Sequence, residues 1–505
     1  MDAVTHDGAG ALRAGRLARW MTGMALLLAM PLLAAEPVAL KPCRLKGVEH
    51  EAWCGVLQRA LDPTQPQGPQ IDLHYAVLPA LARRKAPDPV FFFAGGPGQS
   101  AIELAGPLSK RFARFGNRRD MVFVDQRGTG RSAPLKCRDD DERAPPRPLA
   151  EMLDEGWQLQ RLQACRQALQ KLPHGDLRQY TTTIAMADID AVRQALGVAQ
   201  INAIGASYGT RAVLEYMRQF PKQLRRAVLD GVAPADMVLP AAFSTDNQAA
   251  LDALFDACAN EPACRQRHAT LRAQWQQLLA GLPRELLLQH PLTGQPERVT
   301  LSRTMLLGAV RGPLYSPALA AGLPAALAEA AQGRFEALIG LASGLGGGGG
   351  LSTGMHFSVV CAEDVPRLAQ AADAAGPDFG DSFAALYRNV CAEWPRGTPP
   401  AVFYTLPPAS VPTLIVSGSA DPATPPRHGA RVARALGPQA RHVVVPNAGH
   451  GVLQLACLRE SVQRFVDADD GEQALKVDAD CAAALPRPPA FVPVNPIAAS
   501  AGAAR

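Results

Sequence analysis

The sequence predicts an α/β fold in which a mostly parallel sheet is covered by helices and interrupted by a helical insertion. Short apolar runs alternate with amphipathic helical runs at 89–231 and again at 411–466, and such alternation is typical of parallel sheets. Between them, residues 233–410 are rich in alanine and leucine, with helical periodicity and no obvious run of strands. Polar, glycine-containing turns follow the apolar runs, where open α/β sheets place their sites.

Length and composition indicate a folded protein with two lobes or a large insertion. The chain has 505 residues, of which 48% are hydrophobic and 19% charged, which excludes a disordered or fibrous protein. The formal net charge is only +5 and the arginines are scattered. Nucleic acid is therefore not expected as a partner.

The first 35 residues have the pattern of a secretory signal peptide. Arg13, Arg16 and Arg19 precede an apolar stretch at 21–35 that ends in two alanines, as signal peptides do. The stretch is shorter than the roughly 20 residues that span a bilayer, and a retained N-terminal anchor is the alternative. We expect a periplasmic or secreted protein, cleaved near Ala35, with no stable membrane association afterwards.

The ten cysteines fit an exported chain, because an even number in that setting suggests disulfide bonds. Connectivity does not follow from sequence, but the spacing favours local bonds between consecutive cysteines. The expected pairs are Cys43 with Cys54, Cys137 with Cys165, Cys258 with Cys264, Cys361 with Cys391, and Cys457 with Cys481. No C-x-x-C spacing occurs, so neither a zinc site nor a thiol-redox site is expected.

The first part of the core is predicted at 36–232 and begins at a sheet edge. β-like stretches around 54–57 and 71–78 suit an antiparallel pair. A buried strand at 89–93 ends in the glycine-rich segment 94–100. The bare backbone N–H groups of that segment suit an anion or an oxyanion, with a tight turn as the alternative.

A second buried strand, at 120–124, ends in the polar loop D-Q-R-G-T-G-R-S. We interpret Asp125 and Arg127 as bracing this loop through a buried ion pair rather than as catalytic residues. Threonines at 181–183 are predicted to cap a helix at 184–196. A strand at 226–231 continues the alternation.

The stretch around Ser207 has the pattern of a nucleophile elbow. An apolar strand at 201–205 meets a helical run at 211–220 through G-x-S-x-G. Glycines two residues before and after the serine avoid collisions in the sharp strand-to-helix turn. The helix directs its N-terminal N–H groups to where negative charge develops in acyl transfer. The motif alone is as often an ordinary turn, and the flanking strand and helix favour the functional interpretation.

The insertion at 233–410 is predicted to be a helical cap. Its glycine-rich run at 344–350 is interpreted either as a lid hinge or as a disordered connector. The core resumes at 411–485 with strands at 411–418 and 441–445 and a helix at 453–466. The remaining residues, 486–505, are rich in proline and alanine and are expected to form a flexible tail.

Three predicted strand ends carry Ser207, Asp421 and His450, in the chain order of the catalytic triad of the α/β-hydrolase fold. His450 is expected to take the serine proton, and Asp421 to hold the imidazole tautomer. The backbone N–H groups of Gly96 and Tyr208 are the expected oxyanion donors.

Two other histidines compete with His450 for the base role. His442 begins a strand, where the pleat places its side chain, and His428 lies in a presumed helix after the aspartate. His450 lies in a glycine-flanked loop that can reach the elbow. We therefore assign the base to His450.

Together these motifs resemble the prolyl aminopeptidase group, and more closely its exported tripeptidyl-aminopeptidase-like branch. The matching segments are G-G-P-G at 95–98, D-Q-R-G-x-G-x-S at 125–132, G-A-S-Y-G at 205–209, Asp421-Pro422 and Gly449-His450. The resemblance covers about residues 40–480. Ala94 departs from it, since many relatives have histidine there, and altered bracing of the loop is expected rather than lost activity.

The resemblance implies a serine exopeptidase that releases proline or a short peptide from a free N-terminus. No cofactor and no metal are expected. Such a site needs an anion for the substrate ammonium. The cap offers Glu363 and Glu393, beside Cys361 and Cys391; we expect Glu363 to serve and Glu393 to be a surface carboxylate.

Two alternatives remain open at this stage. A carboxylesterase would use the same machinery, because the fold does not decide the substrate. A non-catalytic binding protein is disfavoured, since no triad member is missing. The number of residues removed per cut and the oligomeric state are not predicted.

Overall fold

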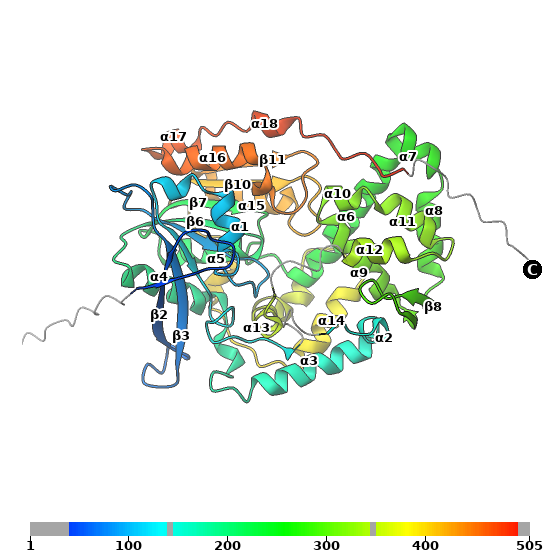
Figure 1. Cartoon of the computed structure of the whole chain (residues 1–505), viewed down its shortest axis with the longest axis horizontal. Coiled ribbons are helices and arrows are strands. Elements are labelled where there is room, and N and C mark those ends of the chain that lie inside the picture. The colour runs from blue at the N-terminus through cyan, green and yellow to red at the C-terminus, as the bar shows by residue number, and fades with distance from the viewer. Residues whose placement is uncertain (1–39, 139–144, 344–349, 493–505) are drawn as a thin grey trace, which may run out of the picture. The chain divides into compact units, whose positions relative to one another are not determined.

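The computed structural model of the chain (Figure 1) describes residues 40–138, 145–343 and 350–492. The predicted signal peptide, most of the glycine-rich run and the end of the predicted tail lie outside the described residues. Within the described ranges, no helix combines the length and the apolar character needed to cross a membrane.

A mostly parallel sheet forms the centre of the fold, as predicted. In the described residues its nine strands are, in order across the sheet, β1 (Lys41–Cys43), β2 (Ala52–Ala60), β3 (Gln70–Leu78), β5 (Met121–Val124), β4 (Val90–Phe93), β6 (Ile201–Ala206), β7 (Leu224–Asp230), β10 (Thr413–Gly418) and β11 (Ala440–Val445). Six neighbouring strands of this sheet are parallel to one another, namely β5, β4, β6, β7, β10 and β11. β1, β2 and β3 add the antiparallel edge.

Helices cover both faces of the sheet. One face packs against α1 (Ala105–Arg111) and α16 (Ala456–Asp467). The other packs against α4 (Thr182–Ala195), α5 (Tyr208–Gln219) and α15 (Pro426–Leu436). Strands that are buried on both faces are apolar throughout and show no alternation of apolar and polar residues. For this reason β4 and β5 are predictable from the sequence as unbroken apolar runs.

The segment between β7 and β10 has a hydrophobic core of its own, centred on the fully buried Trp275. Its helices are α6 (Leu239–Asn260), α7 (Pro262–Arg267), α8 (Leu271–Ala280), α9 (Arg303–Leu314), α10 (Pro317–Ala320), α11 (Leu323–Ala330), α12 (Glu336–Ser343), α13 (Thr353–Glu363) and α14 (Ser382–Cys391). We call this segment the cap. From the preceding part of the chain, α2 (Leu149–Met152) contributes Leu149 to the same core, and α3 (Glu155–Leu169) follows it.

The cap also contains a β-hairpin that the sequence did not predict, formed by β8 (Arg284–Gln289) and β9 (Pro296–Leu301). Both strands are mostly exposed, so their apolar residues make too short an alternation to distinguish from the surrounding helical pattern. The ring of His290 stabilises the turn, because its Nδ1 accepts hydrogen bonds from the N–H groups of Leu292 and Thr293 at 3.1 and 3.2 Å.

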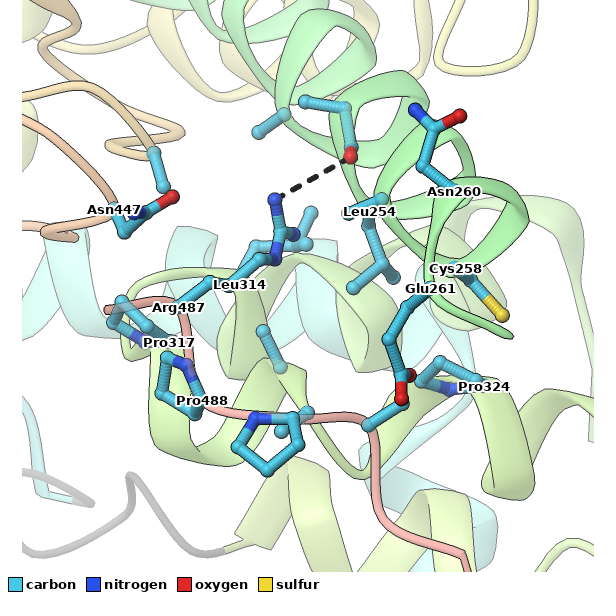
Figure 2. Close-up of a pocket in the computed structure, with 18 of the residues that line it drawn as sticks. Leu254, Cys258, Asn260, Glu261, Leu314, Pro317, Pro324, Asn447, Arg487 and Pro488 are labelled. Carbon is cyan, nitrogen blue, oxygen red and sulfur yellow. Dashed lines mark hydrogen bonds between the residues drawn. The ribbon is translucent and has the colours of Figure 1, made fainter. Parts of the chain in front are cut away.

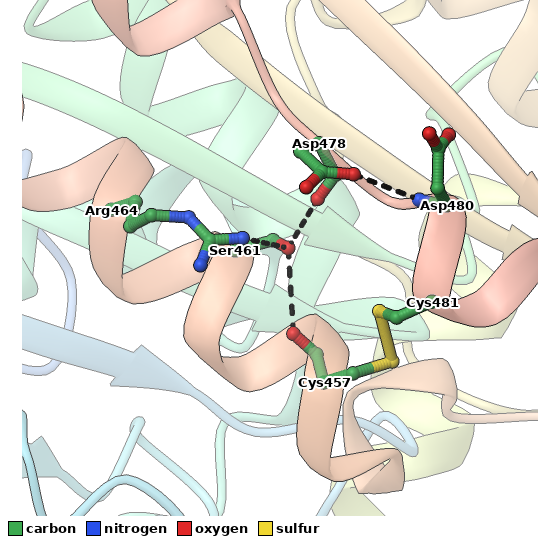
Figure 3. The surroundings of a disulfide bond; sticks show 6 residues. All are labelled: Cys457, Ser461, Arg464, Asp478, Asp480 and Cys481. Atoms are coloured by element: carbon green, nitrogen blue, oxygen red, sulfur yellow. Dashed lines mark hydrogen bonds between the residues drawn. A yellow bond between two sulfur atoms is a disulfide. The ribbon is translucent and has the colours of Figure 1, made fainter.

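The ten cysteines form five disulfide bonds, in the same consecutive pairs that the spacing favoured. The last of them, between Cys457 and Cys481, joins α16 to α18 (Asp480–Ala483), as Figure 3 shows. Nearby, the Ser461 hydroxyl donates to the carbonyl oxygen of Asp478 at 2.6 Å (Figure 3). The end of the core is therefore fixed at two points before the chain leaves it.

The chain after α18 runs from the core to the cap (red in Figure 1). We call residues 485–492 the C-terminal strap. The Asn447 side chain donates to the carbonyl oxygen of Leu485 at 2.8 Å, and the Phe491 N–H donates to the carbonyl oxygen of Ala321 at 2.8 Å. Residues 486–492 of the predicted flexible tail thus contact the cap, because proline-rich extended chain still offers backbone groups that the cap can bind.

The strap covers an apolar cavity of about 420 Å³ lined mainly by alanine, proline and leucine side chains of the cap. Figure 2 shows Arg487 extending from the strap toward α6, where its guanidinium donates to the carbonyl oxygen of Ala253 at 3.5 Å. Core and cap are therefore linked by the C-terminal strap as well as by the two connections of the chain, after β7 and before β10.

Candidate active site

Ser207 lies in the sharp turn between β6 and α5. Its φ of 55° and ψ of −126° are in a region that non-glycine residues rarely adopt. A Cβ atom at Gly205 would collide with the backbone of Gly209, and one at Gly209 would collide with the carbonyl oxygen of Phe93. The two glycines of G-x-S-x-G are therefore required by close packing of β4, β6 and α5.

His450 and Asp421 form a hydrogen-bonded pair beside the elbow. The distance from His450 Nδ1 to Asp421 Oδ2 is 2.8 Å. Ser207 and His450 line one cavity, whereas the Asp421 side chain is fully buried behind the imidazole. The three predicted triad residues are thus brought together by the ends of β6, β10 and β11.

Asp421 is held by four donors. Its Oδ1 accepts from the N–H groups of Ala423 and Thr424 at 2.8 and 2.9 Å. Its Oδ2 accepts from the Thr424 hydroxyl at 2.8 Å as well as from His450. Sequence reasoning missed Thr424, although a threonine three residues after a turn aspartate is a local signal for such a contact.

The pair shifts both pKa values. Burial lowers the pKa of His450, but the Asp421 carboxylate more than offsets this, so the pKa lies above its ordinary 6.5. Burial raises the pKa of Asp421, but His450 and the bonds from Thr424 and Ala423 bring it below its ordinary range. An ionised carboxylate of this kind stabilises the imidazolium that forms when histidine takes a proton.

The cap supplies a second support for His450. The ring of Tyr315 lies edge-on to the imidazole with centroids 5.1 Å apart. The backbone carbonyl oxygen of Tyr315 also accepts a hydrogen bond from the backbone N–H of His450 at 3.0 Å. No sequence signal points to Tyr315, because it is remote in the chain and reaches the site only when the cap packs against the core.

Gly96 and Tyr208 border the cavity beside Ser207. A Cβ atom at Gly95 would lie 3.3 Å from Ser207 Cβ. The glycine-rich loop, residues 94–100, therefore lies directly against the nucleophile elbow. Gly96 has a φ of 108°, which favours glycine. Their predicted role as oxyanion donors is compatible with this position and stays a prediction.

The polar loop after β5 braces the glycine-rich loop, but not through the predicted ion pair. Asp125 accepts from the Ser100 hydroxyl at 2.6 Å and from the Ile102 N–H at 3.1 Å. Arg127 instead pairs with Asp188 of α4, at 2.6 Å. The two residues therefore tie the loop to different elements, since the carboxylate faces the glycine-rich loop and the guanidinium faces α4.

Glu363, the expected anchor for a substrate ammonium, lies in a buried ion pair instead. The residue is 0% exposed and does not line the cavity. It accepts from the Thr182 N–H at 2.7 Å and from the Thr182 hydroxyl at 3.0 Å, and lies 3.3 Å from the Arg211 guanidinium. Asp364 also binds Arg211, at 3.0 Å.

This differs from the sequence expectation because Arg211, on the first turn of α5, is a buried cation that requires carboxylates. Burial raises the pKa of Glu363 to about 7. Glu393 is exposed and pairs with Arg166 at 2.6 Å, as a surface carboxylate would.

The cavity in front of Ser207 has a volume of about 710 Å³, within the range of small-molecule and short-peptide pockets. The core forms one wall, with Gly96, Ser207 and His450. The cap forms the other wall, with Phe243, Arg311, Tyr315, His356 and Tyr387.

The carboxylate that lines this cavity, among the described residues, is that of Asp230. Its oxygens accept from the N–H groups of Val452 and Leu453 at 2.8 and 3.0 Å. Burial raises its pKa to about 6. No group of metal-binding side chains is found in the described ranges.

The two competing histidines lie away from this cavity. The His428 side chain is fully buried and its Nε2 lies 2.9 Å from Asp246 Oδ2. His442 Nε2 lies 3.0 Å from the Ser417 hydroxyl. Neither lines the cavity with Ser207.

Comparison with known proteins agrees with this geometry. Residues 88–454 match the family model of the alpha/beta hydrolase fold. Serine protease Hip1 of Mycobacterium tuberculosis is 27% identical over 437 residues, which cover 79% of this chain and 83% of that protein.

Two further relatives differ in their named activities. Carboxylesterase B of M. tuberculosis is 29% identical over 414 residues, 76% of this chain and 78% of that protein. Tripeptidyl aminopeptidase of Streptomyces lividans is 30% identical over 188 residues, 35% of each chain. The chain belongs to the α/β-hydrolase fold family, and it is a serine hydrolase.

Proposed function

We propose that this serine hydrolase is an exported exopeptidase that releases N-terminal residues, proline or a short peptide, from peptides with a free amino terminus. The observation that carries the proposal is the cavity itself. The His450–Asp421 pair, Ser207 and the glycine-rich loop meet at one wall, and the cap forms the other. A pocket with a cap along one wall favours the end of a chain over its middle.

In the proposed reaction the Ser207 hydroxyl attacks the scissile carbonyl and gives its proton to His450 Nε2. The N–H groups of Gly96 and Tyr208 donate to the oxyanion. His450 then protonates the leaving amine, and the acyl-enzyme forms. Water, deprotonated by His450, attacks the ester and releases the N-terminal fragment, which restores the serine.

Export and domain boundaries belong to the same proposal. Five disulfide bonds suit an oxidising compartment such as the periplasm or medium. We assign 1–35 to a cleaved signal peptide, 36–232 and 411–485 to the core, and 233–410 to the cap.

A carboxylesterase is the second candidate, and a specific observation favours it. Among the described residues, the cavity offers no uncommitted carboxylate for a substrate ammonium, since Asp230 binds backbone N–H groups and Glu363 is buried behind Arg211. A relative named carboxylesterase B covers most of the chain. Neutral acyl esters need no such anchor.

A substrate panel decides between the two. The purified protein is assayed with mono-, di- and tripeptidyl arylamides, each N-free and N-acetylated, and with short acyl nitrophenyl esters. An exopeptidase cleaves the N-free arylamides and loses most of its kcat/KM on acetylation. Preference for esters, with indifference to acetylation, establishes the esterase instead.

The panel is repeated with Ser207→Ala. We expect about a 10⁴–10⁶-fold loss of kcat for whichever substrates the wild type cleaves. A serine-directed phosphonate should label the wild type at Ser207 and leave the variant unlabelled. Labelling elsewhere, with activity retained, would place the nucleophile at another residue.

A further inference from the structure

Arg311 of α9 brings a guanidinium into the cap wall of the active-site cavity. One of its Nη atoms donates to the Tyr315 hydroxyl at 2.6 Å. Its Nε is buried and has no hydrogen-bond partner among the residues that the structure describes. In the described part of the chain, no carboxylate lies within ion-pair distance of it.

Aromatic rings hold this guanidinium. Its central carbon lies 4.6 Å from the ring centroid of Phe243, 5.3 Å from that of Tyr315 and 5.4 Å from that of Phe383. Stacking on rings satisfies the faces of a guanidinium but leaves its in-plane N–H donors available. Those donors match the two oxygens of a carboxylate.

The same helix connects Arg311 to the reacting groups. Tyr315, which accepts from Arg311, lies one turn further along, and its ring contacts the imidazole of His450. The positive charge of Arg311 is close enough to oppose protonation of His450 and of His356. A group bound to Arg311 would therefore lie close to the scissile bond.

The charges of the cavity lining are unbalanced. Arg111, Arg211 and Arg311 line it, against the carboxylate of Asp230. Arg211 is neutralised by Asp364 and Glu363. Among the described side chains, neither Arg111 nor Arg311 forms an ion pair with a carboxylate, and both are only partly buried. A cation on the wall of a cavity attracts an anionic ligand and can donate charge-assisted hydrogen bonds to it.

We propose that Arg311 binds a carboxylate of the substrate and makes the enzyme selective for anionic substrates. The inference rests on the proposed peptidase function of the same site. The carboxylate has two possible sources in a peptide: the acidic side chain of the residue before the scissile bond, or the α-carboxylate of a short leaving fragment. Both present the same planar anion to the guanidinium.

Two matched substrate pairs test the proposal and separate the sources. The first pair is N-free Ala-Ala-Glu-arylamide and Ala-Ala-Gln-arylamide. The second is a short alanine peptide as the free acid and as its C-terminal amide. The wild type is expected to prefer the charged member of one pair by about 10–100-fold in kcat/KM, the range of a charge-assisted hydrogen bond.

Arg311→Met should reduce that preference to near one, and Arg311→Lys should restore part of it, because a lysine keeps the charge but not the planar fork. The ratio within each pair is independent of any general loss of activity caused by repacking. Arg334→Met is the matched control, because Arg334 is an exposed cap residue and the substitution removes the same charge from the protein. It should keep the wild-type ratio.

Each other outcome is decisive. Cleavage of both members of both pairs with a ratio below two, or a preference that survives Arg311→Met, overturns the role of Arg311 and leaves the proposed peptidase function standing. If no peptide is cleaved but nitrophenyl esters are, the peptidase function is wrong. The charge test then passes to nitrophenyl hemisuccinate and nitrophenyl butyrate, with the same variants and the same expected ratios.

Discussion

Two histidine–aspartate pairs in this molecule have nearly the same nitrogen–oxygen distance, although His450 pairs through Nδ1 and His428 through Nε2, and their surroundings differ. His450 and Asp421 are 2.8 Å apart, and His428 and Asp246 are 2.9 Å apart. Both carboxylates are buried. The His450 side chain, however, is 19% exposed and faces the cavity, whereas that of His428 is 0% exposed.

The partners of the aspartates explain the difference. Asp421 accepts from the turn that carries it and from His450. Asp246 belongs to α6 of the cap and also accepts from Arg427 at 2.6 Å, so the second pair links α15 of the core to the cap. Pairing with a carboxylate therefore does not make a histidine a base; access to a nucleophile does.

Matched substitutions should separate the pairs most sharply. His450→Leu removes the proposed base and is expected to lower kcat by about 10⁴–10⁶-fold. His428→Leu is expected to keep kcat within about tenfold but to lower the free energy of unfolding by about 1–3 kcal/mol, because Asp246 loses a buried donor. Steady-state kinetics and urea unfolding measure the two effects. Equal losses of kcat in two folded variants would contradict the comparison.

The aspartates should divide in the same way, with a somewhat smaller effect on rate. Asp421→Asn keeps the shape but offers the wrong tautomeric partner, and kcat is expected to fall by about 10⁴-fold. Asp246→Asn should instead destabilise the contact between α6 and α15, with kcat nearly retained. A large kcat loss in Asp246→Asn, measured below its unfolding transition, would assign the second pair to catalysis.

The comparison also shows what the sequence can and cannot predict. Ser207, Asp421 and His450 were predictable because each follows an apolar strand, and parallel strands deliver their ends to one edge. His450 could be preferred over His428 because a glycine-flanked loop allows reach that a helix does not. These features are local in sequence.

Arg311, Tyr315 and the partners of Glu363 depend instead on how the cap packs. Glu363 beside Cys361 looked available for a substrate because nothing near it in sequence neutralises it. The cation that pairs with Glu363 is Arg211, which lies on α5, four residues after Ser207 and remote from Glu363 in the sequence. The C-terminal strap was missed for a related reason, since its hydrogen bonds use backbone groups that composition does not reveal.

The pH profile gives a smaller but more specific effect. His450 must be neutral to accept a proton, and its pKa is raised above 6.5 by Asp421. Activity should therefore fall as the pH drops through that raised pKa, so the acid limb of kcat/KM lies above pH 6.5. In Asp421→Asn the residual activity should show this limb at lower pH.

The same shift has a defined sign for stability. Because the folded pKa of His450 is the higher one, its stabilising contribution is present below pH 6.5 and is lost as the pH rises through the folded value. Urea unfolding of the wild type and of His450→Leu across this window measures it. A stability difference that grows with pH would contradict the raised pKa.

The smallest effect is expected on the free energy of unfolding, in a comparison of the His428–Asp246 pair with the C-terminal strap. The two are comparable because both link core and cap. Arg487 makes one long contact, 3.5 Å to the carbonyl oxygen of Ala253, whereas His428 is fully buried. Arg487→Ala should therefore lower the free energy of unfolding by only about 0.5–1 kcal/mol.

If the two links act independently, Arg487→Ala and His428→Leu should add to within about 0.5 kcal/mol in the double variant. Urea unfolding of the two single variants and the double variant completes the cycle. A coupling well beyond that value would mean that the strap and the His428–Asp246 pair hold the cap as one unit. The cap would then release both contacts together, in a single cooperative step.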